Sequence, residues 1–127
     1  MNTLSLLSVP SDLLFRPKLA GVVQHAGVYL GGGRVIENTP ETGERLASLS
    51  EFAAGNPVRM ERASQPLTAV LARAQRVLTV PKPWDAVSRN CEHTAYEVAT
   101  GEARSPQLAL ILVLLALAGI ILVANRD

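Results

Sequence analysis

Cysteine, histidine and aromatic residues are scarce in this 127-residue chain, which has one cysteine, two histidines and 4% aromatic residues. A single cysteine excludes a disulfide within the chain and is typical of a reducing compartment. One cysteine and two widely separated histidines do not match the ligand spacing of metal sites, and no glycine-rich phosphate loop is present, so we expect neither a metal nor another cofactor. The net charge of +1 lacks the basic surplus of nucleic-acid-binding proteins, and we expect no nucleic-acid partner.

Apolar residues are concentrated in one uninterrupted run, residues 108–124. As an α-helix this run rises about 25 Å, which is close to the thickness of the hydrocarbon core of a bilayer. A buried core helix would normally carry a polar stripe, and this run has none. We therefore predict that residues 108–124 cross a bilayer as one helix, and we divide the chain into a domain, residues 1–104, and a C-terminal transmembrane anchor, residues 105–127.

The N-terminal segment is a poor signal peptide, because no basic residue precedes its apolar patch and Pro10 and Asp12 interrupt it. The expected topology is therefore a single-pass C-terminal anchor with the domain facing the cytoplasm. Basic residues outnumber acidic ones between residues 59 and 89. We interpret this segment as a solvated face, with contact to anionic lipid headgroups as the alternative. The sequence identifies no protein partner.

A β-hairpin is the clearest feature of the domain. Residues 22–30 and 34–38 are rich in β-branched and apolar residues, and GGG at residues 31–33 supplies the positive φ angles of a tight turn. Residues 12–16 and 56–62 resemble further strands, the first ended by a proline. Residues 37–43 are predicted to form a polar loop.

Two helices are predicted between the hairpin and the cysteine. Ser48 and Glu51 have the spacing of a capping box, which predicts a short helix. Residues 67–78 form an amphipathic helix with Arg73 and Arg76 toward water. Its predicted apolar face consists of Leu67, Val70, Leu71, Ala74 and Leu78.

The cysteine lies in the segment SRNCEHTAYEVATG, which begins at residue 88. Asn90 is a good N-cap and Gly101 a good C-terminal stop, so Cys91 occupies the first turn of a helix. Ala95 and Val98 follow at helical spacing, which directs Cys91 inward. Free N–H groups and the helix dipole at this position lower the pKa of a thiol and favour the nucleophilic thiolate. A lone cysteine is otherwise usually a small core residue, and both interpretations stay open from these residues alone.

A nucleophilic cysteine needs a base. His93 lies about 200° around the helix from Cys91 and does not easily face the thiol. His25, on the first hairpin strand beside small residues, is the better base. Glu37 and Asn38 compete for the role of orienting its imidazole.

The hairpin register decides between these two residues. A three-residue loop pairs Leu30 with Arg34 and Gly27 with Glu37, which brings Glu37 onto the face of His25. A two-residue loop flips the strand and presents Asn38 instead. We favour Glu37.

Residues 24–40, QHAGVYLGGGRVIENTP, and residues 89–107, RNCEHTAYEVATGEARSPQ, resemble the lecithin–retinol acyltransferase-like family. Within it, the chain is most similar to the small phospholipase A/acyltransferase proteins, which end in a C-terminal membrane helix. The resemblance implies an α+β fold of the circularly permuted papain-like (NlpC-type) kind, with a small antiparallel sheet packed on helices and the histidine before the cysteine.

The resemblance also implies a catalytic site. The family's nucleophile falls on Cys91 and its base on His25, and its third polar residue, commonly a second histidine, falls on Glu37. Glu37 is therefore a departure from the family pattern. Further candidates for the oxyanion hole, or for support of the catalytic side chains, are Asn90, Asn38 and Tyr29.

The implied reaction is acyl transfer from a membrane phospholipid through a thioester on Cys91, with His25 as general base. The expected protein is a membrane-tethered phospholipase A1/A2-type acyl hydrolase or acyltransferase. Two alternatives stay open: a papain-like cysteine peptidase or amidase, and a catalytically silent membrane-tethered interaction module.

Overall fold

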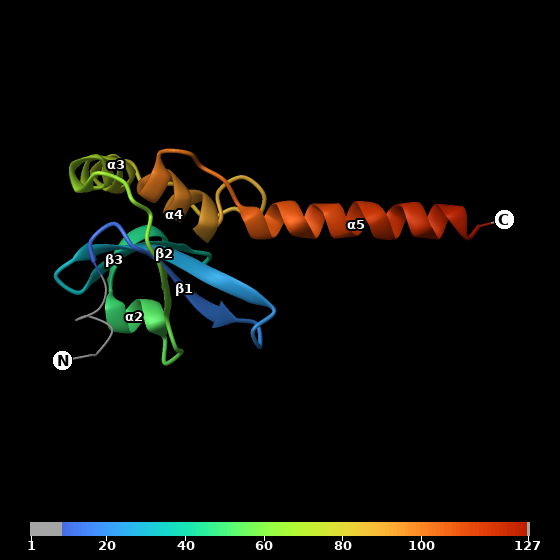
Figure 1. Ribbon diagram of the computed structural model, residues 1–127, viewed down its shortest axis with the longest axis horizontal. Helices are drawn as coiled ribbons and strands as arrows, with labels where there is room; N and C mark the ends of the chain where they lie inside the picture. Colours follow the sequence, from blue (N-terminus) through green and yellow to red (C-terminus); the bar gives the residue numbers. More distant parts are fainter. Residues whose placement is uncertain (1–8, 127) are drawn as a thin grey trace.

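The computed structural model describes residues 9–126, which form an α+β domain and one projecting helix (Figure 1). The strands are β1 (Leu13–Lys18), β2 (Val23–Gly31), β3 (Arg34–Thr39), β4 (Gly43–Ser48) and β5 (Arg59–Glu61). They make a five-stranded antiparallel sheet in the order β4-β3-β2-β1-β5. The helices are α2 (Leu49–Ala53), α3 (Leu67–Thr79), α4 (Cys91–Thr100) and α5 (Pro106–Ala124).

The predicted hairpin is formed by β2 and β3, and Gly27 pairs with Glu37 as predicted. The route to this register differs from the prediction, because Gly31, not Leu30, pairs with Arg34. A two-residue turn alone would present Asn38. An irregularity between Tyr29 and Gly31 inserts one residue into β2 and restores the pairing of Glu37.

Strand β4 was missed, since residues 37–43 were predicted as a loop without a strand after them. β4 pairs with β3 along its length and places Arg45 opposite Glu37. Its sequence, GERLAS, buries Glu44 while Leu46 is 37% exposed. A half-buried strand is normally recognised by alternating apolar and polar residues. In β4 a charged residue, Glu44, occupies a buried position, so this alternation is not visible in the sequence. The predicted end of β1 is also wrong, because the strand continues past Pro17, which pairs with Gln24, to Lys18.

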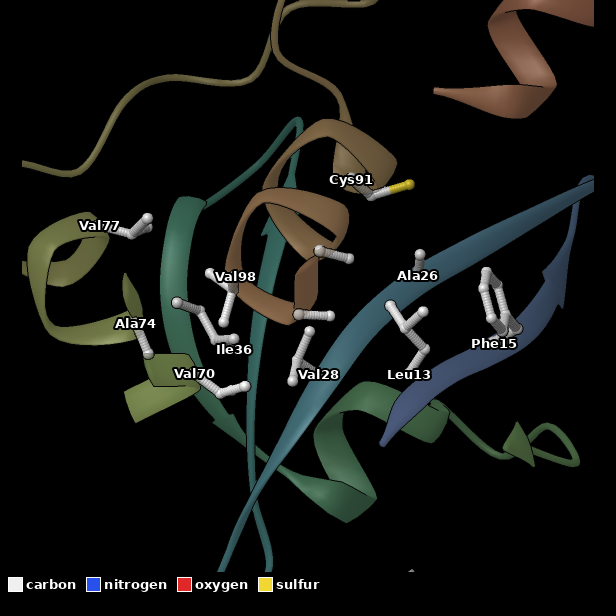
Figure 2. Close-up of a cluster of buried hydrophobic side chains, with 12 residues drawn as sticks. Leu13, Phe15, Ala26, Val28, Ile36, Val70, Ala74, Val77, Cys91 and Val98 are labelled. Atoms are coloured by element: carbon white, nitrogen blue, oxygen red, sulfur yellow. The ribbon is translucent and has the colours of Figure 1, made fainter. Parts of the chain in front are cut away.

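Helices cover both faces of the sheet (Figure 1). α4 packs on β2 and β3 with α3 behind it, and the cluster between them includes Val28, Ile36 and Val98. Cys91 lies at the margin of this cluster, at the start of α4 (Figure 2). On the opposite face, Phe52 of α2 centres a second cluster. α2 begins with the predicted capping box, in which Ser48 and Glu51 each accept the other's backbone N–H.

The buried face of α3 is rotated from the prediction. Val70, Ala74 and Val77 are buried, whereas Leu67 and Leu71 are 43% and 42% exposed. The difference arises because α3 packs mainly against α4 and only with a smaller contact against β4, so a narrow set of small side chains makes the contact.

The basic segment is not a uniformly solvated face. Arg73 donates to the carbonyls of Val98 and Ala99 at the end of α4, at 2.8 and 3.2 Å. Arg89 is 8% exposed and binds Glu44. These two arginines stabilise packing within the domain.

Helix α5 projects away from the domain (Figure 1). It begins at Pro106 with Ser105 as its N-cap and contains 19 residues, with a mean hydropathy of 2.9 over its most apolar window. None of these 19 residues is buried against the domain. By length and composition it is able to cross a membrane. α5 is therefore not part of the hydrophobic core of the described domain.

Candidate active site

Helix α4 begins and ends where the sequence predicted. The Asn90 side chain accepts the N–H groups of Glu92 and His93 at 2.9 and 3.3 Å, and Gly101 adopts the left-handed conformation at the other end. The His93 ring accepts the N–H of Asn90 at 3.0 Å, which makes His93 part of the cap. Cys91, 4% exposed, is the first residue of the helix.

The start of α4 lies against a free edge of β2. Pairing with β3 ends at Gly27, while β2 continues to Val23 with β1 as its neighbour. The Cys91 thiol donates to the carbonyl oxygen of Gln24, with the sulfur 4.0 Å from that oxygen. The divergence of β2 and β3 therefore creates the space in which the thiol reaches the strand that carries His25.

His25 is held on two sides. Its Nε2 lies 2.8 Å from Glu37 Oε1, and both residues are 2% exposed. Its ring stacks on Phe52 with centroids 5.1 Å apart. A Cβ at Gly27 would come within 2.8 Å of Phe52, so glycine is required there for this stack. Since Nε2 contacts Glu37, Nδ1 is the ring nitrogen left to interact with Cys91, the residue that together with Glu37 raises the pKa of His25.

Glu37 is itself anchored by Arg45, a residue the sequence analysis did not identify. The Arg45 Nε donates a hydrogen bond to Glu37 Oε2 at 2.9 Å, and Arg45 Nη2 lies at an ion-pair distance of 2.9 Å from the same oxygen. Burial alone would raise the pKa of Glu37, but the hydrogen bonds and charges of His25 and Arg45 outweigh it and lower the pKa. Glu37 is therefore ionised, with one oxygen on the imidazole and the other on the arginine.

Cys91 and His25 shift each other toward an ion pair. Burial would raise the pKa of the Cys91 thiol, but the hydrogen bond from His25 and the charges of Lys18 and His25 outweigh it and lower the pKa. Burial would likewise lower the pKa of His25, but hydrogen bonds to Cys91 and Glu37 raise it overall. Both directions favour a thiolate beside an imidazolium.

Lys18 is a second residue that sequence reasoning missed. Its Nζ lies 3.9 Å from the Cys91 sulfur, and it occupies the last position of β1, beyond the proline at which that strand was predicted to end. Pairing of β1 with the free end of β2 carries Lys18 to the thiol. The sequence would have indicated Lys18 as a neighbour of the thiol only if the first strand had been predicted to continue past Pro17.

Two of the remaining predicted residues support the site, and Asn90 also lines the cavity beside Cys91. Asn38 is fully buried and donates to the Arg89 carbonyl and the Thr94 hydroxyl, at 2.9 and 3.1 Å, so it fixes the segment before Cys91 and does not face His25. Both ends of the Asn90 amide are engaged in the helix cap and in bonds to Ala86 and Ser105.

Tyr29 was expected near the site, and the structure places it elsewhere. Its hydroxyl accepts the N–H of Gly33 in the hairpin turn at 3.0 Å. Four residues along a strand separate it from His25, which is about 13 Å. Tyr29 therefore stabilises the hairpin and does not reach the thiol.

A cavity of about 320 Å³ opens over the thiol. Its wall comes from the end of β1, the start of β2, the segment before α4 and the start of α5. The lining includes Cys91, Lys18, Trp84, Leu108 and Ile111. Within residues 9–126, no three His, Cys, Asp or Glu side chains are placed to hold a metal ion.

Comparison with models of protein families identifies a match. The family model described as lecithin retinol acyltransferase matches residues 8–104, which is more than half of the chain and includes Cys91, His25 and Glu37. No curated protein matches the sequence.

Proposed function

The chain belongs to the lecithin retinol acyltransferase family, and from this premise we propose that it is a membrane-tethered, cysteine-dependent phospholipid acyl hydrolase or acyltransferase of the phospholipase A type. Family membership implies acyl transfer as the reaction class. The observation that carries the finer proposal is the contact series from the Cys91 thiol through His25 to Glu37, at the base of a largely apolar cavity.

The order of these parts in the chain supports a circularly permuted papain-like arrangement. The histidine lies on a strand that precedes the cysteine helix, and the nucleophile begins a helix packed on that strand. The chemistry of a thiol–imidazole pair depends on this juxtaposition and not on chain order.

In the first half of the proposed reaction, the Cys91 thiolate attacks an ester carbonyl of the phospholipid. The Cys91 sulfur bonds to the carbonyl carbon, and the charge passes to the carbonyl oxygen. The backbone N–H of Cys91 is a first-turn donor that the Asn90 cap does not use, and we assign it to this oxyanion. The carbon–oxygen ester bond then breaks, and the imidazolium of His25 gives its proton to the departing lysophospholipid.

In the second half, an acceptor releases the acyl group. Neutral His25 takes a proton from water, or from an acceptor hydroxyl or amine, as that group attacks the thioester. The carbon–sulfur bond breaks and returns the thiolate beside a protonated His25. The products are a fatty acid or an acylated acceptor.

Glu37 has the orienting role in this scheme. Relatives commonly carry a second histidine at this position, and the carboxylate here adds a negative charge that favours the imidazolium. Arg45 neutralises part of that charge and fixes the carboxylate. The ion pair of Glu37 and Arg45 therefore occupies the place of the histidine that orients the base in relatives.

Tethering is proposed through α5, with residues 108–124 in the bilayer and the domain on the cytoplasmic side. Chain termination after Gln107 should release the protein from membranes in a flotation assay. Continued flotation of the truncated chain would show that α5 is not the sole anchor.

The direct test uses the purified full-length chain with mixed phospholipid vesicles. Mass spectrometry should detect lysophospholipid, fatty acid or N-acyl products from the wild type and none from Cys91→Ala, and an acyl adduct should be trapped on Cys91. The same preparations incubated with a peptide library test the peptidase alternative. Absence of both lipid products and adduct would refute the proposal.

A further inference from the structure

The cavity over Cys91 is built jointly by the domain and by the predicted membrane helix. Leu19 and Val23 line it from the domain, whereas Leu108 and Ile111 line it from the first turns of α5. The Leu108 and Ile111 side chains belong to the apolar run that continues to residue 124. The helix that anchors the protein is therefore also a wall of the site.

Hydrogen bonds fix the start of α5 against the catalytic residues. The Gln107 side chain binds the backbone of Gln24, accepting its N–H at 2.7 Å and donating to its carbonyl at 2.9 Å. Gln24 directly precedes the catalytic His25 on β2. The helix position is thus tied to the base by two bonds and does not depend on a flexible linker.

A second tie joins α5 to the catalytic helix. Glu92, next to Cys91 and 3% exposed, accepts the Ser105 hydroxyl at 2.7 Å and the Gln107 N–H at 2.9 Å. Ser105 in turn accepts from Asn90 at 3.1 Å and caps α5. The burial of the Glu92 carboxylate is explained by these two hydrogen bonds. The bonds satisfy the polar groups here and leave an apolar wall.

The size of the cavity limits what it can hold. At about 320 Å³ it is at the lower end of ligand pockets, which range over about 300–1,000 Å³. A whole phospholipid does not fit. By helical spacing, Leu112 and Leu115 lie on the same face of α5 as Leu108, one and two turns farther along, and are 53% and 63% exposed. A long apolar group entering at Cys91 would leave along this surface.

We propose that the first turns of α5 form the acyl-chain subsite: the fatty acyl chain of the substrate runs from Cys91 past Leu108 and Ile111 and then along α5 into the bilayer. This inference rests on the proposed function for the identity of the ligand. The anchor then has a second role, which is to select and align the chain whose ester lies at the thiol.

The chain offers a test that does not require turnover, because Cys91 is its only cysteine. N-alkylmaleimides add the thiolate to their double bond, with a proton passing to the neighbouring carbon and no leaving group. We compare the rates of N-ethylmaleimide and N-dodecylmaleimide with the full-length protein in one nonionic detergent at fixed concentration. The ratio of the dodecyl to the ethyl rate measures recognition of the alkyl chain near Cys91.

Leu108→Trp and Ile111→Trp should fill the subsite. We expect each to lower the dodecyl-to-ethyl ratio about tenfold, the discrimination expected when roughly two methylene groups lose their burial. Ile120→Trp is the matched control, because Ile120 lies on the same helix outside this cavity and is 65% exposed. Its ratio should equal that of the wild type. Unchanged ratios in both subsite variants, or an equal fall in the control, would overturn the inference.

The rate with N-ethylmaleimide reports whether the site itself is intact. Should a tryptophan variant lose that rate as well, Leu108→Ala and Ile111→Ala remove the same contacts without filling the cavity and should lower the ratio less, in the same direction. A flat ratio in these variants would also refute the subsite. If the wild type forms no lipid products but the dodecyl-to-ethyl ratios change as expected, the proposed reaction is refuted and the subsite is not.

Discussion

Two buried glutamates on neighbouring strands have similar partners and different roles. Glu37 on β3 and Glu44 on β4 are 2% and 4% exposed, and each binds an arginine. Glu44 accepts Arg89 through Nε and Nη2, at 2.9 and 2.7 Å, and also the Thr94 hydroxyl at 2.7 Å. Arg89 also binds Glu97 of α4. This cluster ties β4 and the segment before Cys91 to α4.

The difference lies in what the second partner can do. Around Glu44 every partner keeps its proton at ordinary pH, since an arginine and a hydroxyl do not titrate there. Glu37 instead holds a histidine that gains and loses a proton and that contacts a thiol beside a cavity. A buried carboxylate thus supports folding in one place and proton transfer in the other, according to its neighbour. The following changes test that division.

Removal of the base should give the largest effect. His25→Ala should lower kcat/KM about 10³-fold or more, because the thiol loses both its proton acceptor and the proton donor for the leaving group. The measurement is phospholipid turnover in vesicles, with circular dichroism to confirm folding. A variant that stays folded and retains more than a tenth of wild-type activity would show that His25 is not the base.

Loss of the structural glutamate should affect stability. Glu44→Ala leaves the buried Arg89 without its principal partner and should lower the free energy of unfolding by about 3–5 kcal/mol. Glu61→Ala is the matched control: its pair with Arg59 is half-exposed and should contribute under about 1 kcal/mol. Urea unfolding followed by circular dichroism in detergent measures both. Equal effects would mean that the Glu44 cluster is not a stabilising junction.

Loss of the orienting carboxylate should affect activity. Glu37→Gln should lower kcat/KM about 10²-fold, because the amide no longer favours the imidazolium. Asn38→Ala should lower activity less and stability more, since Asn38 binds Arg89 and Thr94 instead of His25. The measurements are kcat/KM and urea unfolding curves of both variants. A larger loss of activity in Asn38→Ala than in Glu37→Gln would remove Glu37 from the mechanism.

The smallest expected effect is a shift in the pH dependence of activity when Lys18 is replaced. Activity should rise as pH passes the lowered pKa of Cys91 and fall as pH exceeds the raised pKa of His25, because both charged forms are required. Lys18→Gln removes a positive charge 3.9 Å from the sulfur, so the acidic limb should move to higher pH. Iodoacetamide alkylation across pH should show this as a few-fold slower reaction at neutral pH. An unmoved limb would exclude Lys18 from thiolate stabilisation.

Much of the site was predictable because its signals are local. Capping residues identified the start of α4 at Cys91, and helical spacing separated His93 from the thiol. Glycines identified the hairpin that carries His25 and Glu37. Arg45 and Lys18 were not predictable, because each reaches the site through a strand whose extent depends on pairing with distant residues.

The sequence by itself determined the helix that begins at Cys91, the hairpin that presents His25, and the apolar run of α5. These features follow from nearest neighbours: caps, turn residues and uninterrupted hydrophobicity. Only the tertiary structure decided which carboxylate meets a histidine and which meets an arginine, because that choice depends on register and on the inserted residue in β2. It also decided that the start of α5 lies against Gln24 and Glu92, since hydrogen bonds between residues far apart in the chain leave no periodic trace in the sequence.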